Sequence, residues 1–518
     1  MNNIPNLCIG DVSPNGQVSI LDEDRLSYSV LNNSKGAVGI RTISKSLLNE
    51  FIGYMIEHPG NTPTEVRNEL CGRTKIDKFE YGYASTLCIM AQMAISKRNA
   101  YRTDKSNENQ NRLSPDDISY ISAIKTKPFV ILGGFSGTGK SQKIKELAFA
   151  TCPNNSHLRT SETTPGNYLL LSVKPNWHDA TEITGFRSSV NRNYYVTDFM
   201  RFLIKAMHFP NVPFFVCLDE MNLAPVEEYF ADFLSVIESR KKTSSGQIVT
   251  DAIIPASVFN EEYNDNFCIF DCLGFERMDR GMTDDGLHET LLGKFIRIDL
   301  INKIKRDGLT IPSNVIIIGT VNMDDTTNSF SRKVIDRAMT FETVVGKFGD
   351  EYFNSDVALN YVKNPLNGEL FLSDEVRATQ MIDEGRFILT KEEQTKILNF
   401  INDINEDLDG SPFKISYRIL NETILLYRSK KRIAEIMKDE DGLADGVDFK
   451  TDLNTIFDDI LMQKVLPRIE GDYEKCSKCL NKLSSRADNN EWQKSYDKIE
   501  FMIKRFGSDR SGFTSFWN

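Results

Sequence analysis

Residues 129–141 read Phe-Val-Ile-Leu-Gly-Gly-Phe-Ser-Gly-Thr-Gly-Lys-Ser, an apolar run that passes directly into a glycine-rich segment. The segment fits the pattern GxxxxGK[ST] at every fixed position, with Gly134, Gly139, Lys140 and Ser141. The apolar run predicts a strand, and the pattern from Ile144 to Ala150 predicts a helix. A strand, a glycine-rich turn and a helix in this order are typical of a loop that binds phosphate groups.

The composition of this loop predicts how it binds. Its glycines let backbone amides turn inward around a phosphate chain, and the helix N-terminus adds a favourable dipole. We expect Lys140 to reach the β- and γ-phosphates and the Ser141 hydroxyl to bind Mg²⁺, so the predicted ligands are GTP or ATP with Mg²⁺. The predicted binding residues are Gly134, Phe135, Ser136, Gly137, Thr138, Gly139, Lys140 and Ser141. A chance glycine-rich turn is disfavoured by the flanking strand and helix.

A second apolar strand, residues 213–218, ends in the adjacent carboxylates Asp219 and Glu220. Asp219 suits the metal, and Glu220 suits a general base that orients the attacking water. By itself an acidic pair after a strand is explained equally well as a plain helix N-cap. Its occurrence with the phosphate loop favours the catalytic interpretation.

A third apolar strand, Val315 to Ile318, runs into Gly-Thr-Val-Asn-Met-Asp-Asp, residues 319–325. An amide at a strand tip can align water against a γ-phosphate, which makes Asn322 a candidate sensor residue. A turn asparagine is the alternative. The position of Asn322 after the acidic strand favours its interpretation as a sensor residue.

The middle of the chain alternates between apolar, strand-like runs and helical patterns. Apolar runs at 129–132, 169–173, 214–218 and 315–318 are separated by helical patterns, which predicts an α/β fold with a parallel sheet covered on both faces. Helical periodicity dominates before and after this part. The predicted domains are 1–118, mostly helical with a helix from Ile43 to Ile56; 119–345, the α/β core; and 346–518, helical.

The composition excludes several classes of protein. The 518 residues include 73 acidic and 62 basic side chains, for a net charge of −11, which does not fit a polybasic nucleic-acid coat. Apolar runs are far shorter than the ~20 residues that cross a bilayer, and the first 30 residues carry several acids, so we expect a cytoplasmic protein with no membrane partner. Nine scattered cysteines predict reduced thiols, and Cys476 and Cys479 are interpreted as two helix cysteines.

Together these motifs resemble the AAA+ motor family. The segments that carry the resemblance are the phosphate loop, Leu-Asp-Glu-Met-Asn-Leu-Ala-Pro (218–225), Tyr-Phe-Ala-Asp-Phe-Leu (229–234) and residues 319–325. Val-Lys-Pro-Asn-Trp-His-Asp (173–179) is similar to a turn found in the McrB branch, the GTP-hydrolysing subunit of modification-dependent restriction systems. The resemblance covers roughly residues 125–475 and implies a P-loop NTPase core with a helical lid.

The resemblance also implies further site residues. Asn322 and Asp325 match the Asn-x-x-Asp signature of McrB-like proteins, although Met323-Asp324 departs from the type member and leaves the choice of GTP or ATP open. AAA+ proteins deliver an arginine to the neighbouring subunit's nucleotide, and Arg337, with Arg332 as second choice, lies where that residue belongs. Arg418 resembles a lid arginine that contacts phosphate in its own subunit. Salt-bridged surface arginines are the alternative.

Two functions follow from the resemblance. The first is a motor subunit of a McrBC-like restriction or phage-defence system, a hexameric or similar ring that acts on DNA with a separate McrC-like nuclease, since no nuclease pattern stands out in this chain. The second is a MoxR-like chaperone that remodels protein, because motor chemistry does not reveal the cargo. An insert at about 241–310 carries several basic residues: Arg277, Arg280, Lys294, Arg297, Lys303, Lys305 and Arg306. We interpret it as a solvated loop region in preference to a DNA contact.

Overall fold

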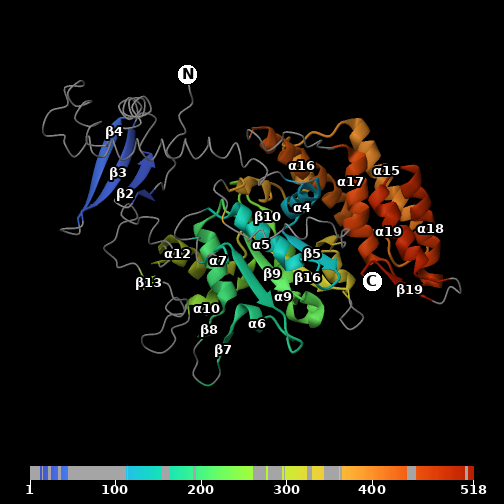
Figure 1. Ribbon diagram of the computed structural model, residues 1–518, viewed down its shortest axis with the longest axis horizontal. Helices are drawn as coiled ribbons and strands as arrows, with labels where there is room; N and C mark the ends of the chain where they lie inside the picture. The colour runs from blue at the N-terminus through green and yellow to red at the C-terminus, as the bar shows by residue number, and fades with distance from the viewer. Residues whose placement is uncertain are drawn as a thin grey trace, which may run out of the picture. The chain divides into compact units, whose positions relative to one another are not determined.

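The computed structural model divides into two compact units, Met1–Arg112 and Leu113–Asn518 (Figure 1). The structure describes residues 12–13, 16–20, 25–32 and 37–44 of the first unit and most of 113–517 of the second. The undescribed stretches of the second unit are 114, 154–157, 159–160, 162, 189, 191–193, 261–275, 278–294, 297, 324–329, 344–360, 362–364, 440–450, 508–511 and 518.

The described part of the first unit is a four-stranded antiparallel sheet. It is formed by β1 (Val12–Ser13), β2 (Gly16–Ile20), β3 (Arg25–Asn32) and β4 (Ala37–Ser44), in chain order. β4 ends at Ser44, so the predicted helix from Ile43 does not include its first two residues, which pair with Leu26 and Arg25. The other predicted helices of this unit lie outside the described residues.

The second unit is built on a five-stranded parallel sheet, as the apolar runs predicted. Its strands are β5 (Phe129–Gly134), β6 (Tyr168–Ser172), β9 (Phe214–Asp219), β16 (Val315–Asn322) and β17 (Met339–Thr343). Their order across the sheet is β17-β5-β16-β9-β6. β17 was not predicted. The sheet, flanked by helices, is consistent with a P-loop ATPase fold.

Strand β16 lies between the phosphate-loop strand and the acidic strand. On one side Asn322 pairs with Gly134 of β5, and on the other Gly319 pairs with Leu218 of β9. All strands are parallel, so their carboxyl ends meet at one edge of the sheet. The polar residues that follow β5, β9 and β16 therefore lie together at that edge.

Helices cover this sheet. α4 (Pro115–Thr126) packs against β5 and β17, and α5 (Lys140–Thr151) packs against β5, β9 and β16. α7 (Asp198–His208) and α9 (Ala231–Glu238) place Phe199 and Phe233 in an edge-to-face contact with ring centroids 5.4 Å apart. β5, β9 and β16 are mostly apolar because they are buried along nearly their whole length, whereas β6 and β17 are only partly buried.

Shorter elements connect the core strands. They are α6 (Thr181–Thr184), β7 (Phe186–Arg187), β8 (Tyr194–Tyr195), η3 (Met221–Leu223), α8 (Val226–Tyr229), β10 (Lys241–Lys242), β11 (Ile248–Val249), β12 (Ala252–Ile254), α10 (Ala256–Asn260), β13 (Glu276–Arg277), β14 (Phe295–Ile296), α12 (Ile298–Asp307), β15 (Leu309–Thr310) and α13 (Arg332–Ile335). The described residues of the predicted insert thus form the antiparallel pairs β10-β11 and β12-β15, the parallel pair β13-β14, and two helices.

Helices make up most of the C-terminal part. After η8 (Gly368–Leu370) come α14 (Ala378–Asp383), α15 (Lys391–Asp407), α16 (Tyr417–Asp439), α17 (Leu453–Ile460), η9 (Leu461–Val465), η10 (Leu466–Arg468), β18 (Glu470–Asp472), α18 (Tyr473–Asn489), α19 (Gln493–Lys504) and β19 (Phe513–Ser515). Thr390 and Glu393 form a capping box that starts α15. Cys476 and Cys479 are buried in α18, as expected.

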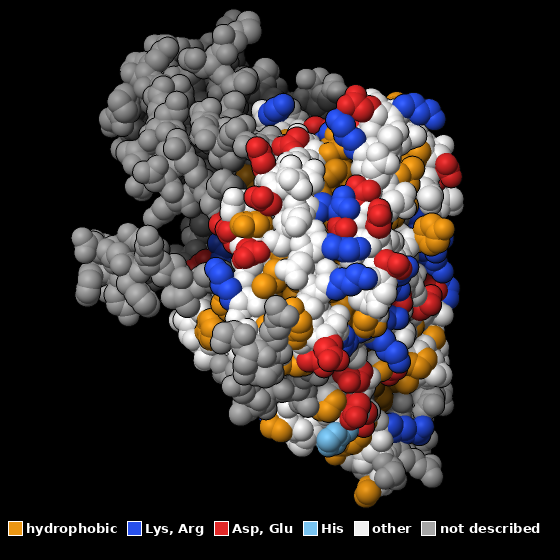
Figure 2. Space-filling model, turned by 90° about the vertical axis from the view of Figure 1, so that its right-hand side faces the viewer, with side chains coloured by type: hydrophobic (Ala, Val, Ile, Leu, Met, Phe, Trp, Pro, Cys, Tyr) orange, Lys and Arg blue, Asp and Glu red, His pale blue; other side chains and the backbone are white. Residues whose placement is uncertain are grey.

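The surface of this helical part has mixed charge. Figure 2 shows Lys and Arg side chains interspersed with Asp and Glu side chains over the face that it presents. Interspersed charges of both signs create no extended field of one sign. Among the described residues, no helix combines the length and the apolarity that crossing a membrane requires.

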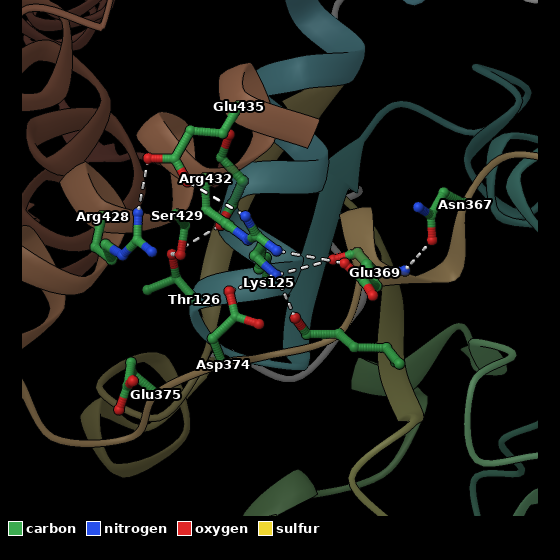
Figure 3. A network of polar contacts seen from close by, with 12 residues as sticks. Lys125, Thr126, Asn367, Glu369, Asp374, Glu375, Arg428, Ser429, Arg432 and Glu435 are labelled. Atoms are coloured by element: carbon green, nitrogen blue, oxygen red, sulfur yellow. Dashed lines mark hydrogen bonds and ion pairs between the residues drawn. The ribbon is translucent and has the colours of Figure 1, made fainter. Parts of the chain in front are cut away.

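Buried polar contacts tie α4 to the C-terminal helices (Figure 3). Lys125 donates to the carbonyls of Glu369 and Leu372 at 2.8 and 2.6 Å and forms an ion pair with Asp374 at 2.8 Å. The next residue, Thr126, donates to Ser429 of α16 at 3.0 Å. Burial lowers the pKa of Lys125, and the carboxylate of Asp374 opposes that shift.

A second buried cluster centres on Glu422 of α16. Its carboxylate forms ion pairs with Lys127 at 2.5 Å and with Lys464 of η9 at 2.8 Å. Burial opposes ionisation of Glu422, but the two ammonium groups outweigh it and hold the pKa of this carboxyl below its usual value. Burial lowers the pKa of Lys464 to about 8. Lys464 also donates to the carbonyl of Ala338 at 2.7 Å, so the cluster joins α16 and η9 to the segment before β17.

We expect Glu422→Gln to destabilise the second unit by about 3–5 kcal/mol, because it leaves two buried ammonium groups without their shared counter-charge. Denaturant unfolding at pH 7 measures this loss. Glu435→Gln, on the exposed part of the same helix, is the matched control and should change stability by at most about 0.5 kcal/mol. Because the pKa of Glu422 is lowered on folding, its contribution holds above about pH 4.3 and disappears as the pH falls through the folded value. Equal losses for the two variants would contradict the role of the cluster.

Candidate functional site

The predicted phosphate loop is an exposed turn between β5 and α5. Phe135 is 57% exposed, and Ser136, Gly137 and Gly139 are also exposed. Gly137 and Gly139 have φ values of 80° and 75°, the left-handed region in which only glycine is unstrained, although a Cβ would meet no neighbour there. The glycines are therefore required by backbone conformation, and their amides lie in a loop that is open to a ligand.

Contacts within the loop hold its shape. The buried Lys140 donates to the carbonyls of Gly134 and Phe135 at 2.9 and 2.7 Å. Thr138 donates to the Phe135 carbonyl at 2.9 Å, and its hydroxyl lies 3.1 Å from that of Thr343 in β17. The ammonium group thus already lies inside the loop, where a phosphate chain would meet it.

The acidic strand tip is bonded to the start of α5. The Ser141 hydroxyl donates to Oδ1 of Asp219 at 2.6 Å, which joins the two residues that the sequence assigned to the metal. The hydroxyl of Thr320 in β16 donates to the same oxygen at 2.7 Å and accepts from the backbone N–H of Glu220 at 3.0 Å. Thr320 therefore holds both Asp219 and Glu220 in place. It does so from β16, which lies between the acidic strand β9 and the loop strand β5.

Glu220 is strained. Its φ of 53° places a non-glycine residue in the left-handed region, a conformation that occurs at functional sites when surrounding contacts enforce it. The Asn322 side-chain amide donates to Oε1 of Glu220 at 2.9 Å. The two predicted catalytic residues are thus in direct contact, and a network runs from Ser141 through Asp219, Thr320 and Glu220 to Asn322.

Two aromatic residues pack next to the turn that follows the acidic pair. Trp177, from the turn after β6, packs edge-to-face on Tyr229 with ring centroids 5.4 Å apart. Tyr229 donates to the carbonyl of Met221 at 2.8 Å, directly after the acidic pair. The tryptophan of the segment that resembles the McrB branch therefore buttresses the acidic strand tip.

The oxygen atoms of this network suit Mg²⁺. The Ser141 hydroxyl and the Asp219 carboxylate are hard donors, and Mg²⁺ is held by few protein oxygens together with substrate phosphates. Behind them, Cys217 of β9 is buried, and burial, aided by the charge of Asp219, raises the pKa of its thiol to about 12. Cys217 is therefore a neutral core residue and not a ligand.

The predicted arginines lie elsewhere. Arg337 precedes β17 and forms an ion pair with Glu238 at 2.6 Å, while its other nitrogen donates to the Lys333 carbonyl at 2.8 Å. Arg418 of α16 forms an ion pair with the same carboxylate. Arg418 and Arg337 therefore share Glu238 as their ion-pair partner, and the contact of Arg418 with bound phosphate remains a prediction.

Arg332 and Asp325 are the remaining predicted site residues. Arg332 donates to the Pro412 carbonyl at 2.7 Å, and its guanidinium lies 5.1 Å from the centroid of the Phe413 ring. Asp325 lies outside the described residues, as do Arg280, Lys294 and Arg297 of the insert.

Sequence reasoning missed Thr320, Asn222 and Glu238. Asn222 donates to the Asn322 carbonyl at 3.3 Å and so links the acidic turn to the sensor strand. Thr320 could have been found, because in a strand with alternating faces it shares a face with Asn322. No local sequence pattern could have identified Glu238 as an ion-pair partner, because Arg337 and Arg418 are about 100 and 180 residues away in the chain.

Comparison with known proteins adds little to this geometry. A family described as a domain of unknown function (DUF8727) matches residues 372–511, the C-terminal helices. A search of curated proteins found no match. Among solved structures, a candidate ATPase from Cytophaga hutchinsonii is similar with a TM-score of 0.34 and 11% identity, over 66% of this chain and 82% of that one. At this TM-score the similarity carries no argument about function.

We expect Thr320→Val to destabilise the second unit by about 1–3 kcal/mol, because it leaves the Glu220 N–H without its acceptor and removes a donor from Asp219. Thr340→Val is the matched control. Thr340 is also buried in the sheet, but its hydroxyl has no hydrogen-bond partner, so its loss should cost close to nothing. Denaturant unfolding compares the two. A cost for Thr340→Val equal to that of Thr320→Val would contradict the positioning role.

Proposed function

We propose that this chain is a Mg²⁺-dependent nucleoside triphosphatase that uses GTP or ATP. The observation that carries the proposal is the continuous network from Ser141 to Asn322 at the mouth of a glycine-rich loop. It brings a phosphate-binding loop, an oxygen-donor pair and a general base together at the carboxyl edge of one sheet, which is where parallel α/β sheets bind ligands.

The residues divide the chemistry among them. The loop amides and Lys140 hold the phosphate chain and neutralise its charge, and Ser141 and Asp219 would hold Mg²⁺, which supplies further positive charge to the phosphates when bound. Glu220 serves as the general base that accepts a proton from the attacking water. The Asn322 amide holds the carboxylate of Glu220 in place by donating to its Oε1 atom.

Arg337 acts in trans in this proposal. The four steps from Met339 to Thr343 along β17 span about 13 Å, and Thr343 pairs with Gly134 of the loop strand, so Arg337 lies at the opposite edge of the sheet from its own loop. From there it serves a neighbouring subunit's nucleotide in a ring, once the phosphate replaces Glu238 as its partner.

The biological setting that we propose is a McrBC-like restriction or phage-defence system. The chain is the motor subunit, acts on DNA and drives a separate McrC-like nuclease. This part of the proposal is supported by the sequence resemblance at residues 173–179, 218–225 and 319–325. Side-by-side hydrolysis of GTP and ATP by the full chain, with and without DNA, tests the choice of nucleotide and the coupling to DNA.

We expect Glu220→Gln to lower kcat by about 10²–10⁴-fold while nucleotide affinity stays close to that of the wild type, because the amide cannot accept a proton but fills the same space. Phosphate release measures turnover, and fluorescent nucleotide titration measures binding. Glu227→Gln, an exposed carboxylate on α8, is the control and should turn over normally. Normal turnover by Glu220→Gln would refute the assignment of the base.

We expect Arg337→Ala to lower kcat by about 10³–10⁵-fold, because the cation that stabilises the transition state is lost. Mixed with Glu220→Gln chains, it should regain turnover at interfaces where each chain supplies what the other lacks. Arg201→Ala, an exposed arginine of α7, controls for loss of charge and should leave turnover unchanged. Absence of rescue at every mixing ratio would count against a role in trans.

A further inference from the structure

Trp517, which follows β19, packs against the strand that leads into the phosphate loop. Its side chain is buried, with 8% of its surface exposed. Gly133 of β5 has no room for a Cβ, because that atom would lie 3.0 Å from Cζ3 of Trp517 and 2.6 Å from Cε of Met323. The indole and the Met323 side chain therefore fill the space over Gly133 together, one residue before the loop begins at Gly134.

The helical C-terminal part holds the indole in this position. β19 pairs with β18, and the Thr514 hydroxyl donates to the Met502 carbonyl of α19 at 2.7 Å. The indole Nε1–H donates to the Pro467 carbonyl at 3.1 Å, and the ring centroids of Trp517 and Phe330 are 5.3 Å apart. Because its N–H is bonded and its ring is packed, the indole is a firm contact between the C-terminal helices and the end of β5.

The carbonyl of Gly134 connects this packing to the candidate site. It accepts from the buried Lys140 ammonium at 2.9 Å and from the backbone N–H of Met323 at 3.3 Å. Met323 directly follows Asn322, so one carbonyl joins the loop lysine to the end of the sensor strand. A distance of 3.3 Å exceeds the usual range of an N–H···O bond, so this bond alone holds Met323 weakly. Packing of the indole beside Met323 supplies the rest of the constraint.

The position of this strand end matters for the proposed base. The Asn322 side-chain amide donates to Oε1 of Glu220 at 2.9 Å, so a displacement of Met323 passes directly to Glu220. A misplacement of about 1 Å can lower the rate of a positioned reaction by about 10²-fold. The loop amides depend instead on the backbone of Gly137 and Gly139, where a Cβ would meet no neighbour within 4 Å. Loss of the indole should therefore affect turnover more than nucleotide binding.

We propose that Trp517 is a positioning residue of the triphosphate site. It sets the end of β16 against the loop strand, and so aligns Asn322 and Glu220 with the phosphate that Lys140 holds. This role rests on the proposed hydrolysis and adds to it that turnover depends on a contact from the helical C-terminal part.

Turnover and nucleotide affinity of Trp517→Ala in the full chain test this role. We expect kcat, from phosphate release, to fall by about 10–10²-fold, while the Kd for the triphosphate changes by less than about threefold. Trp492→Ala is the matched control, because Trp492 is also buried among the C-terminal helices but packs on Phe400 and Phe457. It should lose stability as Trp517→Ala does and keep the wild-type kcat. Trp517→Phe, whose ring still covers Gly133, should recover kcat to within about threefold of the wild type.

Amide hydrogen exchange without nucleotide separates failure of this role from failure of the proposed hydrolysis. The Met323 amide should exchange at least about tenfold faster in Trp517→Ala than in the wild type, and at the wild-type rate in Trp492→Ala. If the wild type binds no triphosphate, the proposed hydrolysis is wrong, and the exchange rates alone decide whether Trp517 positions the strand end. Equal kcat values or equal Met323 exchange rates for Trp517→Ala and Trp492→Ala overturn the role. Should Trp517→Ala not fold, Trp517→Leu replaces it, and a kcat equal to that of Trp517→Phe overturns the role.

Discussion

The position of β16 between β5 and β9 is the constraint on which the candidate site depends. Because β16 is hydrogen-bonded along both edges, its register aligns Asn322 with Gly134 and brings Thr320 within 2.7 Å of Asp219. A slip of one residue would turn Thr320 and Asn322 to the opposite face of the sheet, since side chains alternate along a strand. Two segments that are about 80 residues apart, the loop and the acidic pair, meet only through this strand order.

Buried charge is the second recurring feature of the second unit. Lys125, Glu422 and Lys464 are buried where α4 and the approach to β17 meet the C-terminal helices, and each has a partner of opposite charge. Such pairs contribute little net stability compared with apolar residues, but removing one member is costly. They favour one arrangement of the C-terminal helices on the core over others. Arg240 departs from this rule, because no carboxylate among the described residues forms an ion pair with it.

The fold was partly predictable from the sequence. Four core strands were found because each contains a continuous apolar run, whereas β17 was missed because Met-Thr-Phe-Glu-Thr is half polar and its last three residues are only partly buried. In the first unit, a periodic apolar pattern around Ile43 suggested a helix, yet the first residues of that pattern pair with β3. Strand pairing overrides local periodicity when a partner strand is near.

The sequence by itself determined the candidate site of this protein: which residues form the predicted phosphate loop, which strand ends in carboxylates, and which asparagine follows the next strand. These are local properties, because glycine at positive φ, a helix N-terminus and an acidic pair act over a few residues. Only the tertiary structure decided that Thr320 links the two carboxylate residues, that Glu238 holds both Arg337 and Arg418, and that the buried Arg240 has no ion pair with any described residue. Those facts depend on contacts between distant segments, and nothing in the local sequence encodes which distant side chain will supply or withhold a charge.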